Sequence, residues 1–225
     1  MLRKHFDKLF VLFTFILITT AAIIFRQHPF RFLPLCVSLV IYFLQARVSR
    51  YAYLLGSLNS ITYAIVYIGL GIYASAAQAL LISFPMQLAT FFMWRRRSDG
   101  HSTRLRRLSG NGVLLTVVLF VSAWVALYFI LRALGSTSQI LDNTSTLLGV
   151  LIYVLTMFSF IEYTYLQILA NVIGILLHAS LLRENPGQIT YMIQTACAMF
   201  FAVRAIFRAR ALYKKQQGEL THENS

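Results

Sequence analysis

Long apolar segments recur along the chain, with short polar breaks between them. A helix needs about 20 mostly apolar residues to cross a hydrocarbon core about 30 Å thick. The segments that approach this length are residues 9–25, 32–46, 51–73, 75–94, 113–134, 143–161, 164–182 and 187–207. The pattern predicts an all-α, polytopic membrane protein with about eight transmembrane helices.

The composition excludes an ordinary soluble domain. The 225 residues are 58% hydrophobic and 12% charged, whereas soluble domains have about a quarter charged residues. The first apolar segment ends at Phe25-Arg26 rather than at a small-residue cleavage site, so we expect a retained helix and not a signal peptide. The polar stretch 214–225 is expected to be a disordered tail.

The order of the segments predicts five regions. They are an N-terminal region with an extra helix at 1–31, a first three-helix bundle at 32–94, a basic loop and linker helix at 95–142, a second three-helix bundle at 143–210, and a tail at 211–225. The third helices of the two bundles carry Gln87 and Gln194, and the middle helices carry Asn59 and Asn171. Repeats of this kind are frequent in transporters, whose substrate lies at the repeat interface.

The basic residues predict the orientation. With eight spans, sixteen of the twenty Lys and Arg residues fall on one side of the membrane. The positive-inside rule then places both termini in the cytoplasm of a cell-membrane protein. The net charge of +13 is therefore read as a topology signal. Nucleic acid is excluded as a partner because the charges are scattered over helix ends.

Segment 75–94 contains a proline and a glutamine within apolar surroundings, in the stretch SFPMQLATFFMWRRR. Gln87 precedes Arg95 by eight residues, which places it about 12 Å from the basic boundary at 1.5 Å per residue. Pro85 is expected to kink the helix. Phe84 and Phe91 share the face of Gln87. This face predicts either one wall of a small-molecule binding site or a kink that only serves packing against a neighbouring helix.

Segment 164–182 carries a polar stripe on an otherwise apolar helix. Thr164, Gln167, Asn171, Gly174 and His178 follow one another at helical spacing. Intramembrane polar residues usually face a cavity or another helix, and a stripe of this length favours a cavity. Other candidate lining residues are Asn59 with Tyr63, one turn apart, and Gln194.

Several kinds of chemistry are absent from the sequence. No Asp, Glu or Lys lies inside a predicted span, and coupled carriers usually need such groups. We find no catalytic motif, and the isolated Cys36 and Cys197 do not suggest a metal site. We therefore expect no enzyme activity, no cofactor and uncoupled movement of a small ring-bearing solute, because carboxamides and aromatic faces bind such molecules.

The stretches LLGSLNSITYA (54–64), SFPMQLATFFMWRR (83–96), LDNTSTLLGV (141–150) and ANVIGILL (170–177) resemble the PnuC-type vitamin transporters over residues 50–205. The resemblance implies a three-plus-one-plus-three plan similar to that of the SWEET proteins. It implies facilitated diffusion of nicotinamide riboside or a similar vitamin precursor, trapping by a cytoplasmic kinase, and a homotrimer in the lipid bilayer. Asn59, Tyr63, Gln87 and Asn171 fall where the family's substrate contacts are.

The sequence differs from the family pattern at EYTYLQILAN (162–171), where the family commonly has tryptophans and this chain has none. Carriers for thiamine, riboflavin or deoxynucleosides therefore stay open as alternatives. So does the vitamin-binding membrane component of an energised importer. A membrane enzyme or sensor is the third alternative, although no catalytic constellation is visible in the sequence.

Overall fold

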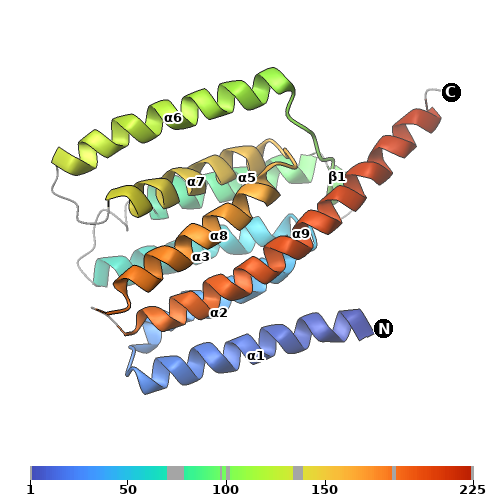
Figure 1. The fold of residues 1–225 in the computed structure, drawn as a ribbon. Coiled ribbons are helices and arrows are strands. Elements are labelled where there is room, and N and C mark those ends of the chain that lie inside the picture. Colours follow the sequence, from blue (N-terminus) through green and yellow to red (C-terminus); the bar gives the residue numbers. More distant parts are fainter. Residues whose placement is uncertain are drawn as a thin grey trace.

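The computed structural model describes residues 2–69, 79–96, 98–99, 102–133, 139–183 and 186–223. Nearly all of them are helical (Figure 1). The helices are α1 (Leu2–Ile24), α2 (Pro29–Gln45), α3 (Tyr51–Gly69), η1 (Ala79–Ser83), α5 (Phe84–Arg96), α6 (Gly110–Ala133), α7 (Gln139–Met157), α8 (Tyr163–Leu181) and α9 (Gln188–Glu223). With η1 and α5 as one continuous segment, they confirm the eight predicted helices. The junctions predicted near residues 74 and 135–142 lie wholly or partly outside the described residues.

The helices pack as two groups of three. In the first group α3 packs against both α2 and α5, and in the second α8 packs against both α7 and α9. The groups meet where α2 contacts α9 and where α5 contacts α7. The third member of the first group begins with the π-helical turn η1, and Pro85 follows at the second position of α5. Because proline has no backbone N–H and disfavours a regular helix upstream, the widened turn fits the irregularity that the sequence predicts at this point.

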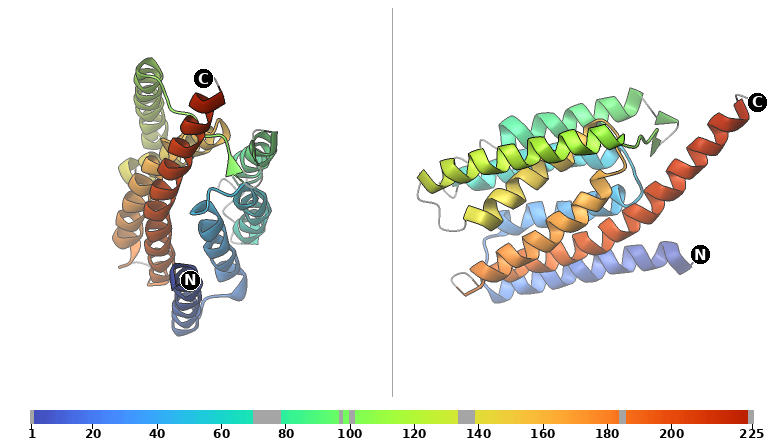
Figure 2. Two further views of the ribbon diagram at one scale, coloured as in Figure 1. Left: turned by 90° about the vertical axis from the view of Figure 1, so that its right-hand side faces the viewer. Right: turned by 45° about the horizontal axis from the view of Figure 1, so that its top comes forward.

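Helices α1 and α6 lie at opposite edges of the molecule (Figure 2). Helix α6 packs on α7, and the Nδ2 atom of Asn143 on α7 donates a hydrogen bond to the carbonyl oxygen of Trp124 on α6 at 2.9 Å. None of the side chains in the window Gly110–Phe129 is buried, although this window is strongly apolar. A helix of this kind needs a lipid environment rather than water.

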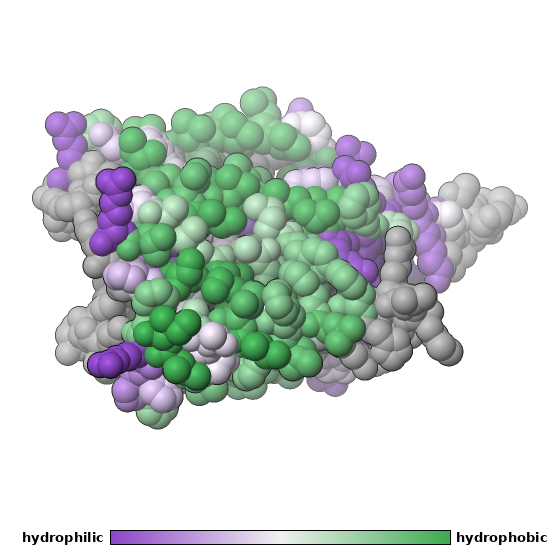
Figure 3. Space-filling view, turned by 60° about the horizontal axis from the view of Figure 1, so that its bottom comes forward, coloured by the Kyte–Doolittle hydropathy of each residue, from purple (hydrophilic) through white to green (hydrophobic). Residues whose placement is uncertain are grey.

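The described helices have the dimensions and surface of a membrane protein. Three stretches are long and apolar enough to span a bilayer, namely Gly110–Phe129, Tyr163–Ser180 and Gln188–Gly218, and Leu9–Ile24, Phe32–Gln45 and Asn143–Met157 are shorter apolar helices. One face of the molecule shows a continuous apolar band, with hydrophilic side chains gathered toward its ends (Figure 3). The protein is therefore a polytopic membrane protein.

Both termini lie at the same end of the molecule (Figure 1), which we call the basic end because Arg95, Arg96 and the basic residues at 104–107 lie there. The segment after α5 pairs β1 (Ser98–Asp99) with β2 (Ser102–Thr103) in antiparallel fashion. It then docks on the α7–α8 turn through Arg106, whose backbone N–H donates to Ser159 O at 2.8 Å and whose carbonyl accepts from Ile161 N at 2.9 Å.

The expectation of a disordered tail at 214–225 is wrong over most of its length, because α9 continues to Glu223. The tail residues extend beyond the rest of the bundle at the basic end (Figure 1). One contact that holds the extension is the side-chain oxygen of Gln216, which accepts a hydrogen bond from the backbone N–H of Leu105 at 3.0 Å. The stretch is polar but rich in good helix formers, and it continues a helix that is already nucleated.

Candidate functional site

A cavity of 430 Å³ lies between the two groups of helices. Its volume falls in the range of roughly 300–1,000 Å³ that is typical of small-molecule pockets. The polar lining consists of carboxamides, phenols and hydroxyls, and no Asp, Glu, Lys, Arg or His is found among the described residues that line the cavity. The carboxamides are Gln45, Asn59, Gln87, Gln167, Asn171 and Gln194, and the phenols are Tyr42, Tyr53, Tyr63, Tyr153 and Tyr163. Such a lining can donate and accept hydrogen bonds and stack on a ring, but it offers no fixed charge.

Asn59 is held by α2 in one orientation. Its Nδ2 atom donates hydrogen bonds to the carbonyl oxygen of Pro34 and to Oγ of Ser38, both at 3.1 Å. A carbonyl can only accept, so the amide nitrogen must face Pro34. The Oδ1 atom of Asn59 is buried and has no partner among the described residues. It is therefore an acceptor that is available to a ligand in the cavity.

The side chain of Gln87 occupies the space left by Gly56, which lies opposite it on α3. Its Nε2 atom donates to Oγ of Ser60 at 2.9 Å, and Ser60 in turn donates to the carbonyl of Gly56 at 3.0 Å. A Cβ atom at Gly56 would collide with the side-chain oxygen of Gln87 and would lie 2.9 Å from its Cδ atom. The missing side chain at Gly56 thus makes the space for the carboxamide. This close approach agrees with the small-residue pattern on α3.

The second group contributes Gln167 and Asn171 from α8. The Nε2 atom of Gln167 donates to the side-chain oxygen of Gln45 on α2 at 3.0 Å, so this pair joins the two groups beside the cavity. The Nδ2 atom of Asn171 is buried and has no partner among the described residues. Asn171 therefore offers a donor, where Asn59 offers an acceptor. Gln194, 6% exposed, adds a carboxamide from α9.

Aromatic side chains close the cavity toward the basic end. Trp94 is fully buried, and its ring centroid lies 4.7 Å from that of Tyr53 and 6.3 Å from that of Tyr163. The indole Nε1 atom donates to the carbonyl oxygen of Thr156 on α7 at 2.7 Å. The cluster draws on α3, α5, α7 and α8, so it spans the contact between the two groups.

Six of the nine predicted site residues line this one cavity: Asn59, Tyr63, Gln87, Gln167, Asn171 and Gln194. The other three do not belong to its lining. Phe84 is half-buried at the start of α5, and Phe91 packs against the aromatic cluster and Tyr51. Thr164 is fully buried and donates to the carbonyl of Ile161 at 2.8 Å.

The remaining members of the α8 stripe face α9 instead of the cavity. A Cβ atom at Gly174 would meet Thr195 at 3.4 Å, which indicates close helix packing. The Nδ1 atom of His178 lies 2.9 Å from the side-chain oxygen of Gln188, and its ring stacks on Tyr191.

Sequence analysis missed the contributions of α2 and α7. Ser38, Tyr42 and Gln45 lie on one face of α2, and Tyr153 and Thr156 lie on one face of α7. The signal was present, because the spacing of 4 and 3 residues on α2 is the spacing of a helical face. It was overlooked because the sequence did not fix the ends of this short segment.

Both the sequence and the fold of this chain are similar to those of known proteins. The family model described as nicotinamide mononucleotide transporter matches residues 28–211. The chain belongs to this family. A search of curated proteins found no match. Among solved structures, the fold is similar to one described as the crystal structure of the vitamin B3 transporter PnuC, with a TM-score of 0.78, 20% identity, and coverage of 94% of this chain and 93% of that chain.

Family membership decides between the general classes that the sequence left open. Members of the nicotinamide mononucleotide transporter family are membrane transporters, so this chain is a transporter and not an enzyme. The structural similarity extends over 94% of this chain, so it is not confined to one group of helices. The resemblance that the sequence motifs suggested is thereby confirmed.

Proposed function

We propose that this transporter moves nicotinamide riboside, or a closely similar unphosphorylated vitamin or nucleoside, by facilitated diffusion. The observation that carries the proposal is the chemistry of the 430 Å³ cavity between the two groups, whose lining, in the part of the chain that the structure describes, has carboxamides and phenols but no charged side chain. An uncharged polar cavity of this size suits one ring system with hydrogen-bonding substituents.

The absence of a cation from the lining favours a substrate without phosphate. The family name refers to nicotinamide mononucleotide, which carries a phosphate group. Proteins usually bind phosphate through Arg, Lys or a helix N-terminus, and the cavity residues within the described ranges include neither Arg nor Lys. A desolvated phosphate without such partners is costly to bury, so the riboside fits this cavity better than the mononucleotide.

The two asparagines suit a ligand that bears a carboxamide. Such a group donates through its nitrogen and accepts through its oxygen. The Oδ1 atom of Asn59 and the Nδ2 atom of Asn171 are unpartnered members of the lining, and they present the complementary acceptor and donor. The tyrosine rings supply faces that attract a cationic aromatic ring such as a pyridinium.

The uncoupled mechanism, the trapping step and the assembly belong to the same proposal. Because the described lining residues include no carboxylate and no histidine, none of them is suited to bind a coupling proton. Net uptake then follows the concentration gradient, and phosphorylation by a cytoplasmic kinase keeps the product inside. We also propose that the basic end faces the cytoplasm of a cell membrane, by the positive-inside rule, and that the protein assembles as a homotrimer, as its resemblance to the PnuC-type transporters implies.

Calorimetry on the detergent-purified protein tests the substrate. The panel is nicotinamide riboside, nicotinamide mononucleotide, thiamine, riboflavin and deoxynucleosides. We expect micromolar or tighter binding of the riboside, and a loss of at least tenfold in Gln87→Ala and Asn171→Ala. Gln188→Ala is the matched control, because Gln188 is a carboxamide that contacts His178 outside the cavity. Binding of the mononucleotide alone would contradict the proposal, as would wild-type affinity in both cavity variants.

Proteoliposomes without ATP or any partner protein test the uncoupled mechanism. We expect the substrate to equilibrate across the membrane at a rate that does not change when proton and sodium gradients are removed. A requirement for a partner and ATP would identify the chain as the binding component of an energised importer instead.

A further inference from the structure

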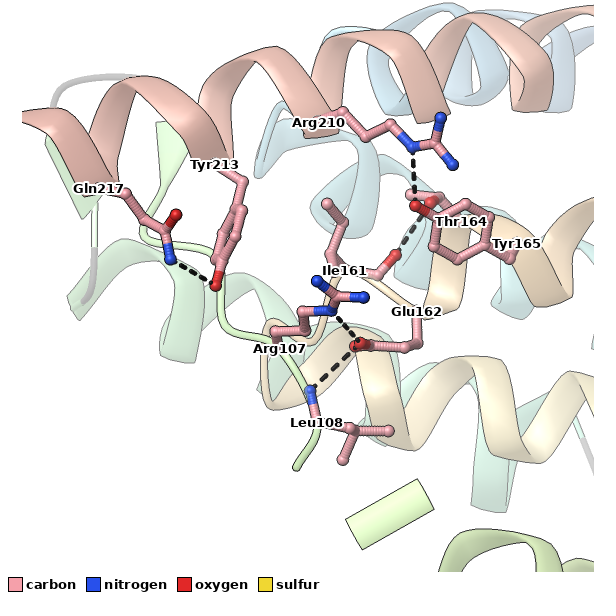
Figure 4. Close-up of polar contacts among 9 residues, drawn as sticks. All are labelled: Arg107, Leu108, Ile161, Glu162, Thr164, Tyr165, Arg210, Tyr213 and Gln217. Atoms are coloured by element: carbon pink, nitrogen blue, oxygen red, sulfur yellow. Dashed lines mark hydrogen bonds and ion pairs between the residues drawn. The ribbon is translucent and has the colours of Figure 1, made fainter. Parts of the chain in front are cut away.

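A second pocket lies at the basic end, apart from the cavity between the two groups. It encloses about 1020 Å³ between the segment before α6, the start of α8 and the extension of α9. Its lining includes Lys214 and the residues Arg107, Glu162, Tyr165, Arg210 and Tyr213, of which the last five are drawn in Figure 4. No residue is shared with the lining of the first cavity, so the proposed transport function does not account for this pocket.

Three basic side chains and one acidic side chain determine the charge of the pocket. The Oε1 atom of Glu162 accepts from the backbone N–H of Leu108 at 3.2 Å and lies 4.0 Å from Nε of Arg107 (Figure 4). Glu162 thus offsets one of the three cations. Arg210 and Lys214 are one turn apart on α9, so they share a face, and they leave the pocket with a net positive charge.

The two cations on α9 are placed differently. The Nε atom of Arg210 donates to the phenolic oxygen of Tyr165 at 2.8 Å (Figure 4). This contact leaves the two terminal nitrogens of the guanidinium for a further acceptor. Lys214 is exposed, and no hydrogen bond or ion pair is found for its ammonium group among the described residues. A planar guanidinium beside an ammonium group is a typical arrangement for binding phosphate oxygens.

The position of this pocket along the membrane normal indicates which kind of phosphate-bearing ligand it binds. Helix α6 begins at Gly110, and its lipid-exposed apolar span begins there too. Val113, one turn into α6, forms part of the pocket wall, and the next exposed side chains along α6 are Leu114, Leu115 and Val117. The pocket therefore changes from basic to apolar where the span starts. Tyr165 and Tyr213 lie in the same layer, which is where tyrosines are enriched at membrane interfaces.

We propose that this pocket binds the phosphate group of an anionic phospholipid. Arg210 and Lys214 contact the phosphate oxygens, Tyr165 holds the guanidinium in place, and an acyl chain lies along Val113 and the exposed face of α6. The lipid bridges the loop before α6 and the extension of α9, two elements that both belong to the basic end. Lys and Arg residues near a membrane surface attract anionic lipids in this way.

Native mass spectrometry of the full-length protein in neutral detergent tests the proposal. The probes are dioctanoyl phosphatidylglycerol, dioctanoyl phosphatidylcholine and inorganic phosphate. We expect saturable binding of the phosphatidylglycerol and at least tenfold weaker binding of the other two. Arg210→Gln and Lys214→Gln should each weaken phosphatidylglycerol binding about fivefold, the effect of one surface cation. Both residues are exposed, so we expect the variants to keep the melting temperature of the parent.

Arg208→Gln is the matched control on the same helix. Arg208 is also exposed, but it lines a different hollow beside Asp7 and Arg204. Its replacement should leave lipid binding unchanged. An equal loss in Arg208→Gln would indicate attraction to a diffuse basic surface and overturn the proposal. So would equal affinity for phosphatidylcholine, or an absence of saturable binding. Competition by inorganic phosphate at similar affinity would show a site for a soluble phosphate and overturn the lipid assignment.

Discussion

The indole Nε1 atom of Trp94 donates a hydrogen bond to the backbone carbonyl of Thr156 at 2.7 Å. Trp94 belongs to the first group of helices and Thr156 to the second, and both are almost fully buried. A carrier that exposes its cavity to each side in turn must separate the two groups at one end. We therefore expect this contact to break before the cavity opens at the basic end.

Trp94→Phe should favour opening at the basic end. The change keeps an aromatic ring but removes a buried hydrogen bond, which contributes about 1 kcal/mol. The reporter is a cysteine introduced at the cavity residue Ile41, in a variant that lacks Cys36 and Cys197. We expect Trp94→Phe to increase labelling by a membrane-impermeant maleimide, applied at the basic end, about fivefold.

Trp124→Phe is the control for this experiment. The indole of Trp124 donates to Oγ1 of Thr144 at 3.0 Å, but it joins α6 to α7 at the edge of the molecule. Its loss should leave the labelling of the cavity unchanged. A similar increase in both tryptophan variants would show that general loosening, and not the Trp94 contact, controls access.

Gly56→Ala should abolish substrate binding, whereas Gly149→Ala should not. A Cβ atom at Gly56 meets the carboxamide of Gln87, which has to leave its place or push α3 and α5 apart. Gly149 lines the same cavity, but a Cβ atom there has no neighbour within 4 Å. We expect a loss of at least tenfold in affinity for the first variant and less than twofold for the second, measured by calorimetry. Equal effects would contradict the proposed role of Gly56.

Asn59→Asp should destabilise the protein more than Ser38→Ala. The aspartate replaces the amide donor that faces the carbonyl of Pro34 with a carboxylate oxygen. The carbonyl keeps the hydrogen bond from Oγ of Ser38 at 2.8 Å, but two acceptors are now in contact and the buried carboxylate oxygen has no donor there, at a cost of about 1–3 kcal/mol. Ser38→Ala removes one of the two acceptors of Asn59 and the hydrogen bond that Ser38 donates to the carbonyl of Pro34, but Asn59 still donates to this carbonyl and no two acceptors come into contact. Thermal unfolding in detergent measures the difference. A higher melting temperature for Asn59→Asp than for Ser38→Ala would contradict the assigned orientation of the amide.

Gln45 and Gln167 should show energetic coupling in transport. Their 3.0 Å hydrogen bond joins α2 to α8 next to the cavity, so each single alanine variant already removes it. We expect the double variant to transport about as well as the single variants, with a coupling free energy of about 0.5–3 kcal/mol in the double-mutant cycle. Strict additivity of the two effects on the transport rate would show that the pair does not act as a unit.

The sequence alone determined the helices of this protein. In the hydrocarbon core, backbone N–H and C=O groups find no water to bond. Apolar segments of this length satisfy these groups by hydrogen bonding within a membrane-spanning helix. It also placed polar residues of the cavity, since a carboxamide such as Gln87 or Asn171 within an apolar segment needs a polar partner. The helical continuation of the tail to Glu223 was not predicted, because it is held partly by a contact with Leu105, over 100 residues away along the chain.

Which polar residues meet depends on how the helices pack in three dimensions. Thr164 and Gln167 lie on the same predicted stripe, yet Gln167 lines the cavity and Thr164 donates to the backbone of Ile161. Ser38 and Thr156 line the cavity although neither stood out in the sequence. Helical periodicity places a residue on a face of its own helix. It does not say which neighbour that face meets, because this depends on the rotation of each helix when the two groups pack together.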